Sequence, residues 1–236
     1  MITLSYSGGL GNQLWQYTTS RIFAEKNKLL MVARKIPNFP NATSIVRGNA
    51  HVFRRERVSG HYLPEAKEGI GYKFNGQLER FEHLIGNEEK AKHWATPIKT
   101  TMDKPERDDL VISIRRGWKN WPADTLCPSI EYYVKLLEKF SYKNLIVCTD
   151  TPDDAYFSEL SSHLDFKIYR GSPVNQFNFI MNSDRYVMAP STFSFWSSFV
   201  GTVSEVYWPN IWALENDETE YDWYPSTDSR YIKITI

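Results

Sequence analysis

Residues 110–117, Leu-Val-Ile-Ser-Ile-Arg-Arg-Gly, decide the fold of this 236-residue chain. The first five residues form an apolar run with one serine, and such a run predicts a strand buried on both faces, the kind found in parallel sheets. Arg115 and Arg116 follow directly, so charge appears where the strand ends. Because ligands of open parallel sheets lie beyond the carboxyl ends of the strands, this boundary is where function should be sought.

Downstream of this strand, helical and strand patterns alternate at regular intervals. The alternation predicts a parallel sheet whose strands are joined by crossover helices. Ser129 is expected to cap the first of these helices. The expected helices are residues 129–140, 153–160, 175–182 and 194–200, and the expected strands are residues 144–149, 166–169, 185–189 and 205–208, the last of which closes the series.

The N-terminal part begins in a similar way. A short strand at residues 2–6 leads through Ser7-Gly8-Gly9-Leu10-Gly11-Asn12-Gln13 into a helix expected over residues 14–27. A second strand of the buried type is expected at residues 29–33. This order of strand, glycine loop, helix and strand is the start of a β-α-β unit.

The middle of the chain separates these two patterned regions. Residues 37–86 are weakly patterned, which predicts short elements and loops. Residues 102–109 are charged, carry a proline and resemble a linker. The length fits one large domain or two small lobes, and the charged stretch fits a linker or an exposed approach.

Composition restricts the class of protein. The chain has 28 Lys and Arg against 28 Asp and Glu, and this zero formal net charge argues against a general nucleic-acid binder. Cys127 and Cys148 form no disulfide framework, and no His or Cys pair has zinc-ligand spacing, so we expect no metal. No signal peptide and no apolar stretch long enough to span a membrane is present, which predicts a cytoplasmic protein.

Polar groups gather at the predicted strand ends, and each has two interpretations. Arg115 and Arg116 fit a surface pair or a phosphate contact. Residues 191–194, Ser-Thr-Phe-Ser, fit an ordinary helix cap or a phosphate cradle of hydroxyls and amides. Asp150 fits a contact to a base or ribose, or a helix cap. The glycine loop fits a tight turn, or a backbone that a ligand approaches closely.

Three blocks, in this order, resemble the α-1,2-fucosyltransferase family of GDP-fucose-dependent enzymes. Residues 8–17, GGLGNQLWQY, resemble the family's N-terminal GGLGNQMFQY block. Residues 113–117, SIRRG, resemble its HxRRGD block, and residues 191–196, STFSFW, resemble the block that ends STFSWW. The resemblance extends from Leu4 to about Trp208.

The resemblance implies a GT-B-like α/β fold, in which two Rossmann-like lobes with parallel sheets face a central cleft. Residues 1–108 would form the acceptor-side lobe, and residues 109–236 the lobe that binds a nucleotide sugar. Arg116, and after it Arg115, would contact the donor diphosphate as the catalytic residues. The remaining donor-binding residues implied by the resemblance are Gly9, Gly11, Asn12, Gln13, Asp150, Ser191, Thr192 and Ser194.

The implied activity is that of an inverting glycosyltransferase. It would move L-fucose from GDP-fucose to a hydroxyl of a glycan acceptor, without a metal or other cofactor. In such a transfer negative charge develops on the departing diphosphate, and fixed arginine and amide dipoles would stabilise it.

Two departures from the family blocks leave alternatives open. Ser113 stands where the family has His, and Trp118 where it has Asp. These changes raise the alternatives of another nucleotide-sugar donor, or of a protein that binds a glycan or nucleotide without turnover. The Asp replaced by Trp118 is a candidate base in the family. In this chain Asp124 or an acid of the N-terminal lobe could supply the base instead, or the transfer could be dissociative, with no strong base.

Overall fold

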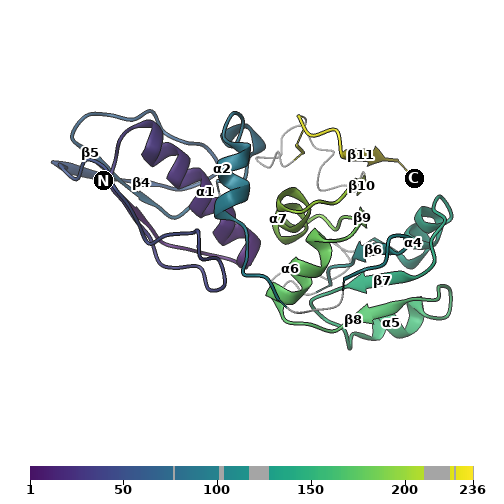
Figure 1. Ribbon diagram of the computed structural model, residues 1–236. Coiled ribbons are helices and arrows are strands. Elements are labelled where there is room, and N and C mark those ends of the chain that lie inside the picture. The colour runs from purple at the N-terminus through teal and green to yellow at the C-terminus, as the bar shows by residue number, and fades with distance from the viewer. Residues whose placement is uncertain (77, 101–103, 117–127, 210–223, 226, 236) are drawn as a thin grey trace. The chain divides into compact units, whose positions relative to one another are not determined.

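The computed structural model describes residues 1–76, 78–100, 104–116, 128–209, 224–225 and 227–235. The chain forms two compact units: the first comprises Met1–Ile98 together with Tyr224 from late in the chain, and the second begins at Lys99 and includes the residues from Pro225 onward. Each unit is built on its own sheet (Figure 1). The linker expected over residues 102–109 begins among residues that lie outside the described ones.

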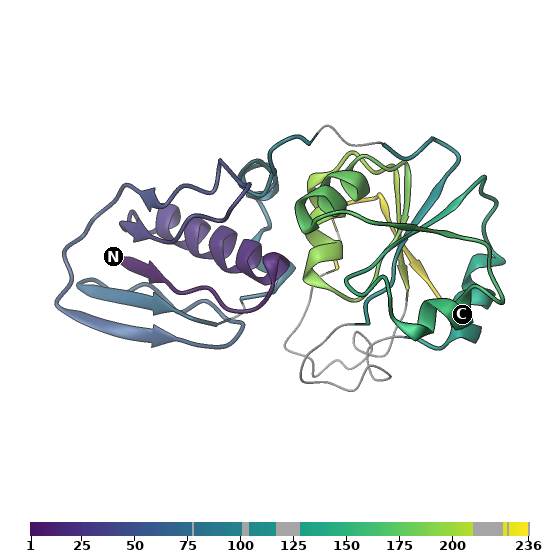
Figure 2. The same cartoon turned by 90° about the horizontal axis from the view of Figure 1, so that it is seen from below.

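The first unit holds a five-stranded sheet in the order β3-β2-β1-β5-β4. Strands β1, β2, β4 and β5 run parallel, whereas β3 pairs antiparallel with β2 at one edge. Helix α1 lies along one face of this sheet (Figure 2). The elements are β1 (Ile2–Leu4), α1 (Leu10–Lys26), β2 (Met31–Val32), β3 (Ile45–Val46), β4 (Arg54–Val58), β5 (Ile70–Phe74), η1 (Phe81–His83) and α2 (Glu88–Trp94).

Helix α1 begins inside the glycine loop, at Leu10, so the start expected at residue 14 is wrong. Gly8 has φ +75°, a left-handed conformation that residues with a Cβ disfavour. The turn at Gly8 allows the helix to begin at Leu10. Gln16 then ties the loop to the helix. Its amide oxygen accepts a hydrogen bond from the Ser7 backbone N–H (3.0 Å), and its amide nitrogen donates to the Ser7 hydroxyl (2.9 Å).

The second unit holds six parallel strands in the order β11-β10-β9-β6-β7-β8. Strand β6 comes first in this unit along the chain but lies in the interior of the sheet. Strands β7 and β8 lie on one side of it, and β9, β10 and β11 on the other. This is the strand order of doubly wound dinucleotide-binding folds. The elements are β6 (Leu110–Ser113), α4 (Ile130–Leu137), β7 (Leu145–Cys148), α5 (Ala155–Leu160), β8 (Lys167–Tyr169), α6 (Pro173–Met181), β9 (Arg185–Val187), α7 (Thr192–Val200), β10 (Glu205–Pro209) and β11 (Tyr231–Ile234).

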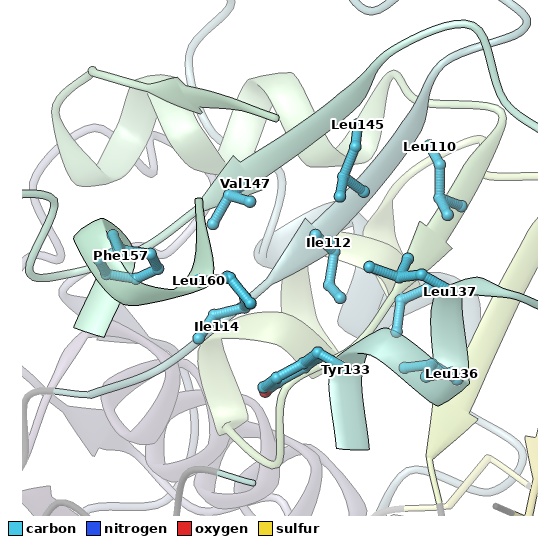
Figure 3. Close-up of a cluster of buried hydrophobic side chains, with 11 residues drawn as sticks. Leu110, Ile112, Ile114, Tyr133, Leu136, Leu137, Leu145, Val147, Phe157 and Leu160 are labelled. Carbon is cyan, nitrogen blue, oxygen red and sulfur yellow. The ribbon is translucent and has the colours of Figure 1, made fainter. Parts of the chain in front are cut away.

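Helices cover both faces of this second sheet (Figure 2). Helices α4 and α5 pack on one face, where apolar side chains of β6 and β7 meet those of the helices (Figure 3). The other face is covered by α6 and α7. Gly201 ends α7, and a Cβ there would lie 2.5 Å from the Cα of Met181, so glycine permits the close packing of these two helices.

Several sequence-based predictions are confirmed in this unit, and one is wrong. Ser129 caps α4, and its hydroxyl accepts a hydrogen bond from the Tyr132 backbone N–H at 3.2 Å. Strand β10 does not close the series, because β11 pairs beside it in parallel.

No helix in the described part of the chain is long and apolar enough to cross a membrane.

Candidate functional site

The strand order of the second sheet reverses between β6 and β9. The chain leaves β6 toward β7 on one side, whereas β9 starts the series on the other. Crossover helices therefore diverge at this point, and the space beyond the carboxyl ends of these two strands is the usual ligand site of such sheets. Arg115 and Arg116 follow β6, and Ser191 follows β9, so the structure brings these predicted residues to one edge.

The tandem arginines both meet carboxylates that follow the neighbouring strand β7. Arg115 Nε lies 3.7 Å from Oδ2 of Asp150, and the backbone N–H of Arg116 donates to Oδ1 of Asp150 at 3.3 Å. Successive residues of a strand point to opposite faces of its sheet, but β6 ends at Ser113, so this alternation does not apply to Arg115 and Arg116. Asp150 thus connects the ends of β6 and β7 and does not cap a helix.

Arg116 is the more deeply placed arginine, with 14% of its side chain exposed. Its Nε lies 3.7 Å from Oδ1 of Asp154, and its guanidinium carbon lies 4.4 Å from the centre of the Tyr156 ring. Asp154 also caps α5, since it accepts a hydrogen bond from the Tyr156 backbone N–H at 2.9 Å. One helix start therefore supplies both the carboxylate and the aromatic face that hold this guanidinium.

Hydroxyl groups connect β6, β9 and α7 beneath this edge. Ser191 caps α7, and its hydroxyl accepts from the Ser194 backbone N–H at 3.1 Å. Ser113 Oγ and the Tyr186 hydroxyl are 2.6 Å apart, and Tyr186 also bonds to Ser194. Burial raises the pKa of Tyr186, so the phenol stays neutral. Thr192 is buried as well, so these hydroxyls fix how the start of α7 meets the sheet.

The glycine loop occupies the corresponding place in the first unit, after β1. Asn12 donates a hydrogen bond to the Glu79 carboxylate at 2.6 Å, and Glu79, which follows β5, is only 2% exposed. Gln13 donates to the Gly8 carbonyl at 3.3 Å. Strands β1 and β5 are adjacent, so the Asn12–Glu79 contact spans two neighbouring strand ends.

The remaining predicted glycines of this loop differ in their surroundings. Gly11 is buried within the first turn of α1. Gly9 precedes that turn, and a Cβ added to it would have no atom within 4 Å. The sequence predicted all four residues, Gly9, Gly11, Asn12 and Gln13, as donor contacts, and those roles stay predictions.

Sequence reasoning missed three residues of these two sites: Asp154, Tyr156 and Glu79. An acid directly before a helix was a signal for the Asp154 cap, but nothing in the sequence links it to Arg116. Glu79 lies in the weakly patterned stretch.

Four residues named in the sequence analysis lie outside the described residues: Gly117, Trp118, Asp124 and Cys127. Within the described ranges, no three His, Cys, Asp or Glu side chains gather in a way that could hold a metal ion.

Comparison with known proteins identifies the fold. Neither a protein-family profile nor a curated protein sequence matches the chain. A solved structure of FUT1 from Arabidopsis thaliana, an arginine-to-lysine mutant in complex with GDP, is similar at a TM-score of 0.51 and 9% sequence identity. The similarity covers 86% of this chain and 69% of that chain. The present chain has a GT-B-like α/β fold. At this identity the likeness establishes the fold alone.

Proposed function

We propose that this protein is an inverting glycosyltransferase that transfers L-fucose from GDP-fucose to a hydroxyl of a glycan acceptor. The observation that carries the proposal is the position of Arg115 and Arg116, at the point where the strand order of the second sheet reverses. The three sequence blocks and the GDP-bound structure with a similar fold support it.

The arginine pair suits a departing diphosphate. A guanidinium carries five N–H donors in a planar fork that matches phosphate oxygens, and it stays charged at every relevant pH. Asp154 and Tyr156 both contact Arg116, which preorganises the cation before the donor arrives. The acceptor hydroxyl would attack the anomeric carbon while the bond to the diphosphate breaks, and the arginines would stabilise the charge that leaves.

The donor contacts proposed in the second unit lie at its strand ends. Ser191 and Thr192 would bind phosphate at the start of α7, where helix amides favour an anion. Asp150 would accept from the base or ribose of the donor. We propose no metal and no other cofactor for the transfer, so activity should persist in EDTA.

Substitution of Arg116 tests the role of the pair. GDP should raise the melting temperature of the wild-type protein, because a ligand that binds only the folded state stabilises it. Arg116→Ala should lower the transfer rate by about 100-fold or more, as loss of an oxyanion donor does, and should weaken GDP binding. Arg170→Ala is the matched control, since Arg170 pairs with exposed Asp153 at 2.8 Å and should leave both unchanged. Full transfer activity in Arg116→Ala would refute the assignment.

A second donor is favoured by one observation. Ser113 stands where the resembling family has histidine, and its hydroxyl is directed to Tyr186 in the protein interior. The same thermal assay with UDP and ADP, and then with their sugars, tests this alternative. Stabilisation by UDP or ADP and not by GDP would replace GDP-fucose as the donor, whereas binding without turnover would indicate a carbohydrate- or nucleotide-binding protein.

A further inference from the structure

The two faces of the first sheet differ in their cover. Helix α1 lies along one face, and α2 is on the same side, because Arg21 of α1 lies over the Trp94 ring of α2 at 4.1 Å (Figure 2). Strand register identifies the residues of the opposite face, since paired residues point the same way: Thr3 pairs with Val32 and Lys73. The strand residues of this face, called here the open face, are Thr3, Val32, Ile45, Arg55, Arg57, Gly71 and Lys73.

The open face is accessible to solvent over much of its width. Val32 is 40% exposed and Ile45 is 62% exposed, although both are β-branched apolar residues. Parallel sheets are normally covered on both faces, and neither α1 nor α2 covers this one. At the β4 end, Phe53 is 93% exposed and lines, with Arg54 and Arg55, a cavity of about 250 Å³.

Three cations occupy the β4–β5 half of the open face. Arg57 pairs directly with Lys73 across the ladder, and Arg55 is the next residue of β4 on the same side. All three are exposed, and in the described part of the chain none of their side chains forms an ion pair or hydrogen bond. Like charges placed directly opposite in a sheet repel one another, so this arrangement weakens the isolated unit. An anionic partner would remove that repulsion.

The composition of the open face argues against a second copy as its partner. A twofold interface presents the same surface twice, and the strand residues of this face include three cations and no carboxylate. Cations of one copy would meet cations or aliphatic side chains of the other, with a desolvation cost and no compensating pair. Charge complementarity therefore requires an anionic partner.

We propose that the open face docks on the surface of a bilayer that contains anionic lipids. The three cations would lie against lipid phosphates, while Val32, Ile45 and Phe53 would enter the boundary between headgroups and acyl chains. These apolar side chains distinguish a bilayer from a soluble polyanion, which would engage the cations alone. The inference concerns the first unit and does not depend on the proposed transferase activity.

Vesicle sedimentation of the full chain tests the proposal. The wild-type protein should pellet with vesicles of equimolar phosphatidylcholine and phosphatidylserine, and little with phosphatidylcholine alone. Each basic side chain near an anionic surface strengthens binding by about fivefold, so R55Q/R57Q/K73Q should lose on the order of 100-fold. The matched control K104Q/R107Q/K135Q removes three exposed cations of the second unit and should bind as the wild type does. Thermal melts should show both variants folded.

A second variant examines the apolar side chains of the same face. Ile45→Ser removes an exposed aliphatic side chain without changing charge, and it should weaken vesicle binding several-fold at every salt concentration. The proposal fails if the wild-type protein does not pellet with anionic vesicles, or if the control triple variant loses as much binding as R55Q/R57Q/K73Q. It also fails if Ile45→Ser has no effect while a soluble acidic polypeptide competes fully, since the partner would then be an acidic protein.

Discussion

Substitution of Gly8 and Gly9 separates the structural and functional reasons for glycine in the loop after β1. Gly8 has φ +75°, and an added Cβ would lie 2.9 Å from Cγ of Asn12. A left-handed backbone costs alanine about 1–2 kcal/mol, and displacing Asn12 from its 2.6 Å hydrogen bond with Glu79 adds about 1–3 kcal/mol. Gly8→Ala should therefore lower the melting temperature by roughly 5–15 °C.

Gly9 meets neither constraint. Its φ is −76°, and no atom lies within 4 Å of an added Cβ. It occupies the cap position of α1, where serine is preferred over glycine, so Gly9→Ser should leave the stability equal or slightly higher. If a ligand approaches this backbone closely, the same variant should lose on the order of 10- to 100-fold in transfer rate.

Melting curves by circular dichroism and a transfer assay on the two variants complete this experiment. The structural reasoning is refuted if Gly9→Ser is destabilised as much as Gly8→Ala, because the two positions would then not differ as their geometry requires. Unchanged transfer by a stable Gly9→Ser protein would remove Gly9 from the proposed donor site.

Two further predictions concern buried hydroxyls. Ser113→Ala removes the hydroxyl that lies 2.6 Å from the Tyr186 hydroxyl, so it should lower the free energy of unfolding, measured by urea titration, by about 1–2 kcal/mol. The affinity for GDP, measured by calorimetry, should not change. A tenfold or larger loss of GDP affinity would show that Ser113 contacts the ligand. Burial raises the pKa of Tyr132 from 10.0 to about 12, so its contribution to stability should be full below pH 10 and lost as the pH rises toward 12. Tyr132→Phe should flatten this alkaline loss in unfolding curves, and an unaltered slope would contradict the assignment.

The sequence predicted the second sheet better than the first, for a physical reason. Strands β6 and β7 are buried on both faces and read as apolar runs, and α4 carries a serine cap. Strand β4, Arg-Arg-Glu-Arg-Val, lies at an edge of the first sheet and is mostly charged. It therefore lacks the apolar pattern that predicts a strand, and it lies within the weakly patterned stretch of residues 37–86. Strand β11 was missed because it is distant from β10 along the chain, so only its pairing defines it.

The candidate site was predictable only in part. Strand ends located Arg115, Arg116, Asp150 and Ser191, because parallel strands bring their carboxyl ends to one edge. The partners of these residues were not predictable, since Asp154 and Tyr156 reach Arg116 through the way α5 docks after β7. The donor-binding roles stay predictions for the experiments above.

The sixth strand of the second sheet has a consequence for biosynthesis. Strand β11 comes from residues 231–234, and Tyr231 donates to or accepts from the Ser198 hydroxyl at 2.9 Å in α7. Domains emerging from the ribosome can fold in the order of translation. The first sheet uses no residue beyond Phe74 and could assemble early, whereas the second sheet is incomplete until residues 231–234 have been made. A ribosome stalled before residue 231 would therefore display a chain whose first sheet can be complete while its second sheet lacks an edge strand.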